Sequence, residues 1–195
     1  MITQGVDKQW QEAFLKTVQQ HENALPLKEA ALQERLGDWT KELTSVVVAT
    51  CEAMGWQASV KDHRLDMLPV PRSEYLALDV MAFASGEKRW RFPAATFELE
   101  NSKSDDQIAY SLWKLLCVRA DMRAVFCYRR NSDEGSALVR FLRDEVVQAM
   151  ELENHVKLEG KTLVVVGSRN DSATFPYGFF KWWSLDINTG TFKLN

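Results

Sequence analysis

The chain has 195 residues, of which 46% are hydrophobic, and these values fit one domain with a single core. Its formal net charge of -3 argues against a protein that coats nucleic acid over its whole surface, but it leaves room for a local basic site. No stretch approaches the roughly 18 uninterrupted apolar residues of a membrane span, and the N-terminal MITQGVDKQWQE lacks the plan of a signal peptide. We therefore expect a cytoplasmic protein that does not associate with membranes.

The N-terminal part of the sequence predicts two helices. Residues 7–22 carry apolar side chains at helical spacing, and Pro26 separates this short helix from the next one. From 27 to 54 the apolar positions step by three and four, which predicts one long amphipathic helix that ends at Gly55. We expect residues 1–25 to form a helical arm added to the core.

The remainder of the sequence predicts alternating strands and helices. Strands are expected at 56–66, 74–83, 92–101, 122–130 and 161–169, and helices at 104–120 and 135–153. The first of these helices begins with Ser-Asp-Asp-Gln, the pattern of a capping box. Residues 175–195 predict a terminal hairpin. The expected fold is α/β (α+β) in a single domain, 1–195, with a core at 27–169 and a mixed sheet of about five strands flanked by helices.

The tetrapeptide ELEN occurs twice, at 98–101 and at 151–154. The second copy ends a predicted helix whose apolar residues face inward, so its glutamates are expected on the solvated side. The first copy lies in a predicted strand, where residues two apart share a face, so Glu98 and Glu100 should project together. Only the first copy therefore presents two carboxylates to one place.

A third carboxylate is expected beside this pair. Asp79 interrupts the apolar run LALDVMAF, and an acid inside such a strand is costly unless it is paired or bound to a metal. A hairpin around SGEKRWRF would place Asp79 roughly opposite Glu98. Converging carboxylates require a cation, and oxygen ligands of this kind suit Mg²⁺ or Mn²⁺. Such a site is typical of phosphoryl transfer.

The order helix, strand, strand with Asp79, strand with Glu98-Leu99-Glu100, helix, strand resembles the core of the PD-(D/E)XK nuclease superfamily, the restriction endonuclease-like fold. The resemblance covers roughly residues 27–169. It implies that Asp79 and Glu98 are metal ligands. Glu100 fills the position of the motif's lysine, as it does in a minority of restriction enzymes, and would orient water or a second ion.

The helix after the motif offers further candidates for the catalytic site. Gln107, Tyr110 and Lys114 fall at i, i+3 and i+7 on one flank of its apolar stripe. RecB-like members of the superfamily carry Gln and Tyr on this helix, and some members take their lysine from it. The same residues also fit a capping glutamine, a partly buried aromatic and a solvated lysine. Lys103, just after the strand, is an equally plausible source of the missing cation.

The first long helix carries Asp38 and Glu42 on one face beside its apolar stripe. Members of the superfamily often draw a further metal-binding acid from this helix, so the resemblance implies that Glu42 or Asp38 reaches the metal. A solvated helix flank explains both residues as well.

Basic and aromatic residues border the expected site. Lys88, Arg89 and Arg91 surround Trp90 in the hairpin loop, and Arg129 and Arg130 end a later strand. These side chains could bind the phosphate backbone of DNA or could simply decorate solvated loops.

The C-terminal segment FFKWWSLD concentrates aromatic residues, which predicts core packing with a face available for a homodimer. Taken together, the sequence predicts a metal-dependent nuclease that acts on DNA. The alternative is a catalytically inactive nuclease-like protein that binds nucleic acid or a protein partner.

Overall fold

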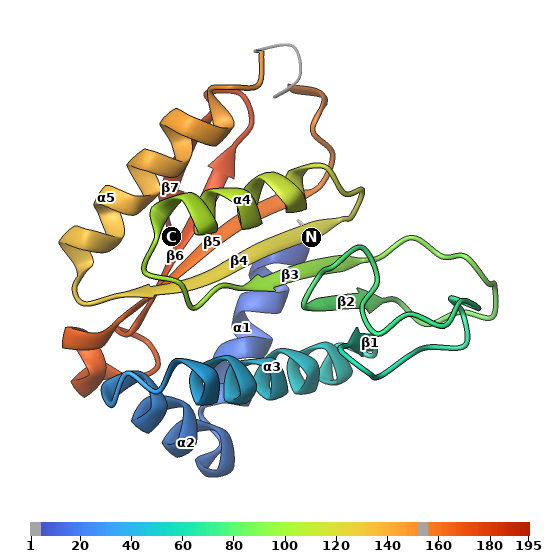
Figure 1. The fold of residues 1–195 in the computed structure, drawn as a ribbon, viewed down its shortest axis with the longest axis horizontal. Coiled ribbons are helices and arrows are strands. Elements are labelled where there is room, and N and C mark those ends of the chain that lie inside the picture. Colours follow the sequence, from blue (N-terminus) through green and yellow to red (C-terminus); the bar gives the residue numbers. More distant parts are fainter. Residues whose placement is uncertain (1–4, 152–155) are drawn as a thin grey trace.

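The computed structural model describes residues 5–151 and 156–195 and shows a seven-stranded mixed sheet with helices on both faces (Figure 1). The helices are α1 (Val6–Val18), α2 (His21–Leu32), α3 (Leu36–Ala53), α4 (Asp105–Leu116) and α5 (Ser132–Leu142). The strands are β1 (Gln57–Val60), β2 (Val80–Phe83), β3 (Ala95–Leu99), β4 (Met122–Arg129), β5 (Lys161–Ser168), β6 (Phe180–Asp186) and β7 (Thr191–Leu194).

The strands lie in the sheet in the same order as in the sequence. β3, β4 and β5 are parallel to one another, and every other neighbouring pair is antiparallel. The two parallel connections run through α4 and α5. Both crossovers advance in the same direction across the sheet, so a uniform right-handed connection places both helices on the same face. This face carries the buried side of α4 and α5, while α1, α2 and α3 cover the other face.

The C-terminal hairpin is part of the main sheet, which is why the sheet has seven strands instead of the expected five. β6 pairs with β5 along the register Val165 to Trp182, and β7 forms the edge. Alternation along β6 buries Phe180 and Trp182 on the side of α1, whereas Trp183 is half-buried on the side of α5. Much of the aromatic content of this segment is therefore used within the fold.

The N-terminal helix belongs to the core and is not an appended arm. Trp10 and Phe14 are fully buried, and the Phe14 ring lies 5.2 Å from that of Phe126 and 5.2 Å from that of Phe180. The Trp10 ring lies 6.2 Å from that of Trp182. The prediction of an arm was wrong because amphipathic spacing identifies a helix but not the surface on which its apolar side packs.

The expected helix over 27–54 is two helices. α2 ends at Leu32, and Glu34 adopts the left-handed conformation with φ of 52° before α3 begins at Leu36. Pro26 does not separate two helices but lies inside α2. The apolar spacing continues across the break, so periodicity alone could not locate it.

Several element boundaries near the proposed site differ from the sequence prediction. β3 ends at Leu99, so Glu100 follows the strand, and β2 begins one residue after Asp79. Ser104 is the N-cap of α4, as expected, but its side chain makes no capping hydrogen bond. A π-helical turn over Arg143–Val147 directly follows α5.

The second ELEN copy lies only partly within the described residues. Glu151 is exposed and follows the helical segment, and residues 152–155 lie outside the described part.

Two described cysteines are buried free thiols, whereas Cys117 is exposed. Within the described residues, none of the helices combines the length and the apolar character needed to cross a lipid bilayer.

Candidate functional site

Glu98 is a buried carboxylate near the carboxyl end of β3. Its strand neighbours Phe97 and Leu99 pack on the side of α1 and α3, so Glu98 projects toward the face covered by α4. Lys114 Nζ lies 2.9 Å from Glu98 Oε2, and the two side chains are only 18% and 6% exposed. Glu98 Oε1 is buried and has no hydrogen-bond partner among the described residues. The site therefore contains one buried ion pair and one free carboxylate oxygen.

Helix α4 delivers Lys114 to this position. Ile108, Leu112 and Leu115 are buried against the sheet, and Lys114 lies on the flank of that stripe. Its ammonium group also donates to the carbonyl oxygen of Ala77 at 2.5 Å. Of the candidate lysines from the sequence, Lys114 is the one that the structure brings to Glu98.

The electrostatic state of Glu98 follows from these surroundings. Burial raises the pKa of its carboxyl from 4.5 to about 7. The hydrogen bond and charge of Lys114 and a hydrogen bond from the Asp79 backbone lower this pKa, whereas the nearby charge of the Asp79 carboxylate raises it further. A group with this pKa is partly protonated at neutral pH and gains from any additional cation beside it.

Asp79 lies across from Glu98 at the start of β2. The antiparallel register pairs Val80 with Phe97, and its continuation by one residue places Asp79 opposite Glu98. This agrees with the hairpin predicted from the sequence. Asp79 Oδ2 accepts a hydrogen bond from the Leu99 backbone N–H at 2.7 Å, so the carboxylate takes the place of a backbone acceptor where the β2–β3 ladder ends. One carboxylate oxygen of Asp79 thereby fixes the geometry of the strand that carries Glu98.

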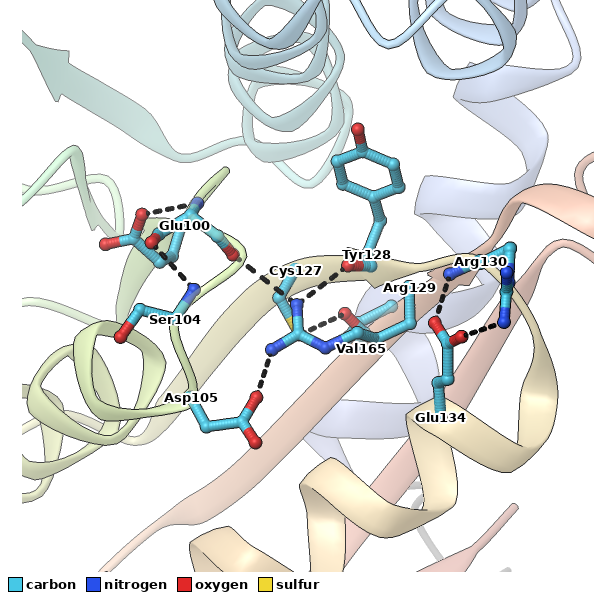
Figure 2. A network of polar contacts seen from close by, with 10 residues as sticks. Glu100, Ser104, Asp105, Cys127, Tyr128, Arg129, Arg130, Glu134 and Val165 are labelled. Atoms are coloured by element: carbon cyan, nitrogen blue, oxygen red, sulfur yellow. Dashed lines mark hydrogen bonds and ion pairs between the residues drawn. The ribbon is translucent and has the colours of Figure 1, made fainter.

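Glu100 does not join the other two carboxylates. Because β3 ends at Leu99, the alternation of the strand stops, and the Glu100 carboxylate accepts hydrogen bonds from the Ser102 backbone N–H at 2.8 Å and from Ser111 Oγ at 3.3 Å. Figure 2 shows Glu100 close to the start of α4. Within residues 5–151 and 156–195, no group of three or more His, Cys, Asp or Glu side chains is arranged to hold a metal ion. The expected convergence of three acids is thus reduced to two.

The other candidates on α4 flank the site in different ways. Tyr110 is exposed, its ring lies 5.8 Å from Lys114 Nζ, and it stacks on Trp113 with ring centroids 6.1 Å apart. Gln107 is exposed on the first turns of the helix. Tyr110 therefore adjoins the Lys114–Glu98 pair through its contact with Lys114.

Two further residues that the sequence predicts for the site lie elsewhere. One has a different ion-pair partner, and the other lies on a helix that covers the opposite face of the sheet. Lys103 Nζ pairs with Glu34 at 2.9 Å and not with Glu98. Glu42 lies on α3, whose buried side covers the sheet face opposite to α4. Asp38, at the start of the same helix, pairs with Arg35.

The basic loop between β2 and β3 lies at the other end of these strands from Asp79 and Glu98, so it does not border the carboxylates as expected but lines a separate cavity. Lys88, Arg89 and Arg91 border a cavity of about 430 Å³ together with His63 and Arg64 from the preceding connection. Arg91 also donates to the carbonyl oxygen of Ala84 and to Gln57 Oε1, which ties the loop to the sheet. The sequence did not identify Arg64 as a neighbour of this loop, because its approach depends on the path of a long irregular connection.

Arg129 and Arg130 lie at the carboxyl end of β4 (Figure 2). The Arg129 guanidinium donates to the carbonyl oxygens of Tyr128 and Ser102 and pairs with Asp105 at 2.5 Å. Arg130 pairs with Glu134 at 2.8 Å. Both arginines thus lie on the same edge of the sheet as the end of β3.

Neither a family model, nor a curated protein, nor a solved structure matches this chain. What the candidate site can do rests on its own residues.

Proposed function

We propose that this protein is a metal-dependent nuclease with a restriction endonuclease-like core, and that it hydrolyses phosphodiester bonds in DNA. The observation that carries the proposal is the buried Glu98 carboxylate, which lies opposite Asp79 and receives Lys114 from α4. Such an arrangement is expensive in a purely structural sheet, because a buried carboxylate beside a second acid is disfavoured. Functional sites are where such costs are commonly retained.

The two carboxylates fit a hard divalent cation. Glu98 Oε1 has no partner in the described residues, and the charge of Asp79 raises the pKa of Glu98, so a cation between the two acids would satisfy the oxygen and relieve the repulsion. Carboxylate oxygens are the ligands that Mg²⁺ and Mn²⁺ prefer. A bound ion of this kind activates a water molecule and offsets charge on the phosphate.

Lys114 supplies the positive charge that the superfamily motif normally carries two residues after its second acid. Glu100 stands at that position here and is held by Ser102 and Ser111. The Lys114 ammonium instead reaches the Glu98 carboxylate from the following helix. In the proposed mechanism Lys114 orients the attacking water and stabilises the developing negative charge on the phosphate.

Basic side chains at the edge of the sheet where β3 ends support a polyanionic substrate. Arg129 and Arg130 end the neighbouring strand β4 on this edge, whereas Lys88, Arg89 and Arg91 lie on the loop at the other end of β2 and β3 and line a separate cavity. Contacts from Lys and Arg to phosphates supply most of the sequence-independent affinity for DNA. Binding should therefore weaken steeply as the salt concentration rises.

Cleavage assays on single-stranded, duplex and modified DNA with Mg²⁺ or Mn²⁺ test the proposal. Glu98→Gln, Asp79→Asn and Lys114→Met should each reduce cleavage at least a hundredfold, whereas Glu151→Gln in the second ELEN copy should leave it unchanged. Full activity of Glu98→Gln would refute the assignment. If the wild-type protein binds DNA without metal and cleaves none of the substrates, the inactive nuclease-like binding protein becomes the better account.

A further inference from the structure

A second charged cavity lies where the parallel strands β3, β4 and β5 reach their carboxyl ends. It has a volume of about 470 Å³. Four cationic side chains line it, against three acidic ones, in a chain whose formal net charge is -3. The cations are Lys103, Arg129, Arg130 and Arg169, and the acids are Glu34, Asp105 and Glu134. In open α/β sheets this edge is where ligands bind.

The cations come from three separate connections, and two of them, Arg129 and Arg169, are less exposed than the acids with which they pair, whereas Lys103 and Arg130 are more exposed than theirs. Arg129 is 11% exposed and its partner Asp105 is 48% exposed. Arg169 is 23% exposed, whereas its partner Glu34 is 40% exposed. Arg129 also donates to the carbonyl oxygen of Ser102 and to that of Tyr128, the second of which Figure 2 shows. The guanidinium groups of Arg129 and Arg169 therefore lie deeper than the carboxylates of Asp105 and Glu34, which lie at the rim of the cavity.

Glu34 holds two of these cations at once. Its carboxylate pairs with Lys103 from the β3–α4 connection and with Arg169 from the end of β5. Glu34 adopts a left-handed backbone conformation with φ of 52° between α2 and α3, where glycine is the usual residue. A charged side chain thus occupies a position whose backbone conformation favours glycine.

We propose that this cavity binds a phosphate group, which lies between Arg129 and Arg169 and replaces the rim carboxylates of Asp105 and Glu34 as their partner. The carboxylates of Asp105 and Glu34 are 48% and 40% exposed, so water can solvate them when they are displaced, and a phosphate in their place keeps both guanidinium groups paired. Guanidinium groups donate pairs of parallel hydrogen bonds that match phosphate oxygens. The source of the phosphate is the backbone of DNA bound at the catalytic site, and this part rests on the proposed nuclease function.

Inorganic phosphate tests the cavity without any nuclease activity. Binding is measured by calorimetry in the presence of EDTA, with chloride keeping the ionic strength constant. Arg169→Gln should weaken phosphate binding at least fivefold, and Glu34→Gln should tighten it because the competing carboxylate is gone. Arg119→Gln and Glu159→Gln change the members of an exposed pair, 3.7 Å apart, whose residues do not line this cavity, and should leave binding unchanged.

The Glu34→Gln result separates a binding site from a purely structural ion-pair cluster. A structural cluster predicts unchanged or weaker phosphate binding in this variant, and either result would overturn the proposal. The same holds if Arg169→Gln keeps the wild-type affinity. Thermal unfolding of each variant shows whether it folds. If Arg169→Gln does not fold, the phosphate affinity of Glu34→Gln still tests the proposal.

Fluorescence anisotropy with labelled single-stranded and duplex DNA, again in EDTA, identifies the source of the phosphate. We expect Arg169→Gln to weaken DNA binding and to reduce the slope of log affinity against log salt by about one. If phosphate binding responds but DNA binding does not, the DNA backbone is excluded as the source. Neither the phosphate measurement nor the DNA measurement depends on cleavage. If the wild-type protein cleaves no DNA but both binding predictions hold, the nuclease function is wrong and the phosphate site remains supported.

Discussion

Lys114 Nζ lies 2.9 Å from Glu98 Oε2, and this ion pair between α4 and β3 is the buried charge contact on which the candidate site depends. Removing one member of a buried ion pair leaves the other charge uncompensated, which typically costs about 3 to 5 kcal/mol. We expect Lys114→Met to lower the free energy of unfolding by about 3 kcal/mol at pH 8. The cost should shrink at pH 5, where Glu98 in the native state is protonated.

Urea denaturation at both pH values, in EDTA, measures this effect. Lys103→Met is the matched control, because its ion pair with Glu34 is exposed and should change stability by less than about 1 kcal/mol. If both lysine variants lost the same free energy of unfolding, the Lys114–Glu98 ion pair would contribute no more to stability than an exposed ion pair.

The raised pKa of Glu98 predicts a pH-dependent stability in the metal-free protein. Between pH 4.5 and about 7 the native carboxyl retains a proton that the unfolded chain has lost, so the free energy of unfolding falls as the pH rises through this window. A shift of this size corresponds to about 3 kcal/mol, fully present below pH 4.5 and absent above pH 7. Glu98→Gln cannot titrate and should lack this part of the pH dependence. Parallel stability curves for the two proteins would contradict the raised pKa.

Divalent metal should stabilise the folded protein through Asp79 and Glu98. Mg²⁺ or Mn²⁺ at a hundred times its dissociation constant should add about 2.7 kcal/mol, if the unfolded chain does not bind it. The melting temperature of the wild-type protein should rise accordingly, and Glu98→Gln and Asp79→Asn should lose most of the shift. Glu151→Gln should behave like wild type, since Glu151 is exposed and follows a helical segment. No shift with either metal in the wild type would remove the main support for the site.

The packing of α1 predicts that the N-terminal helix is required for folding. Phe14 is fully buried among the rings of Phe126, Phe180 and Trp182. Phe14→Ala should lower the free energy of unfolding by about 3 to 5 kcal/mol. Leu25→Ala, on an exposed side chain of α2, should cost less than about 1 kcal/mol in the same denaturation assay. A mild effect at Phe14 would restore the view of this helix as an appendage.

The position of Asp79 opposite Glu98 could be predicted because two apolar strands joined by a polar loop restrict the register. Lys114 was one of several candidates on the sequence, since helical spacing defines a flank but not the distance to a neighbouring strand. Glu100 was expected to share the face of Glu98, and this failed because β3 ends one residue earlier. Alternation holds only within a strand.

The pairing of Glu34 with Arg169 could not be predicted from local patterns. The two residues lie in connections far apart in the sequence, and their approach depends on how α2 and the end of β5 pack together. The break at Glu34 was equally hidden, because Leu32, Leu36 and Trp39 continue the helical spacing across it. Long-range packing overrides periodicity at both places.

The contact of α1 with β6 joins the beginning of the chain to a strand near its end, and this has a consequence for synthesis on the ribosome. At about 5 to 20 residues per second, roughly 8 to 34 seconds pass between the synthesis of Phe14 and that of Trp182. Throughout that interval Trp10 and Phe14 have been made but lack the β6 rings against which they finally pack. The contacts of α1 therefore remain incomplete until β6 has been made, so chaperone binding during synthesis should affect the yield of folded protein more than its final stability.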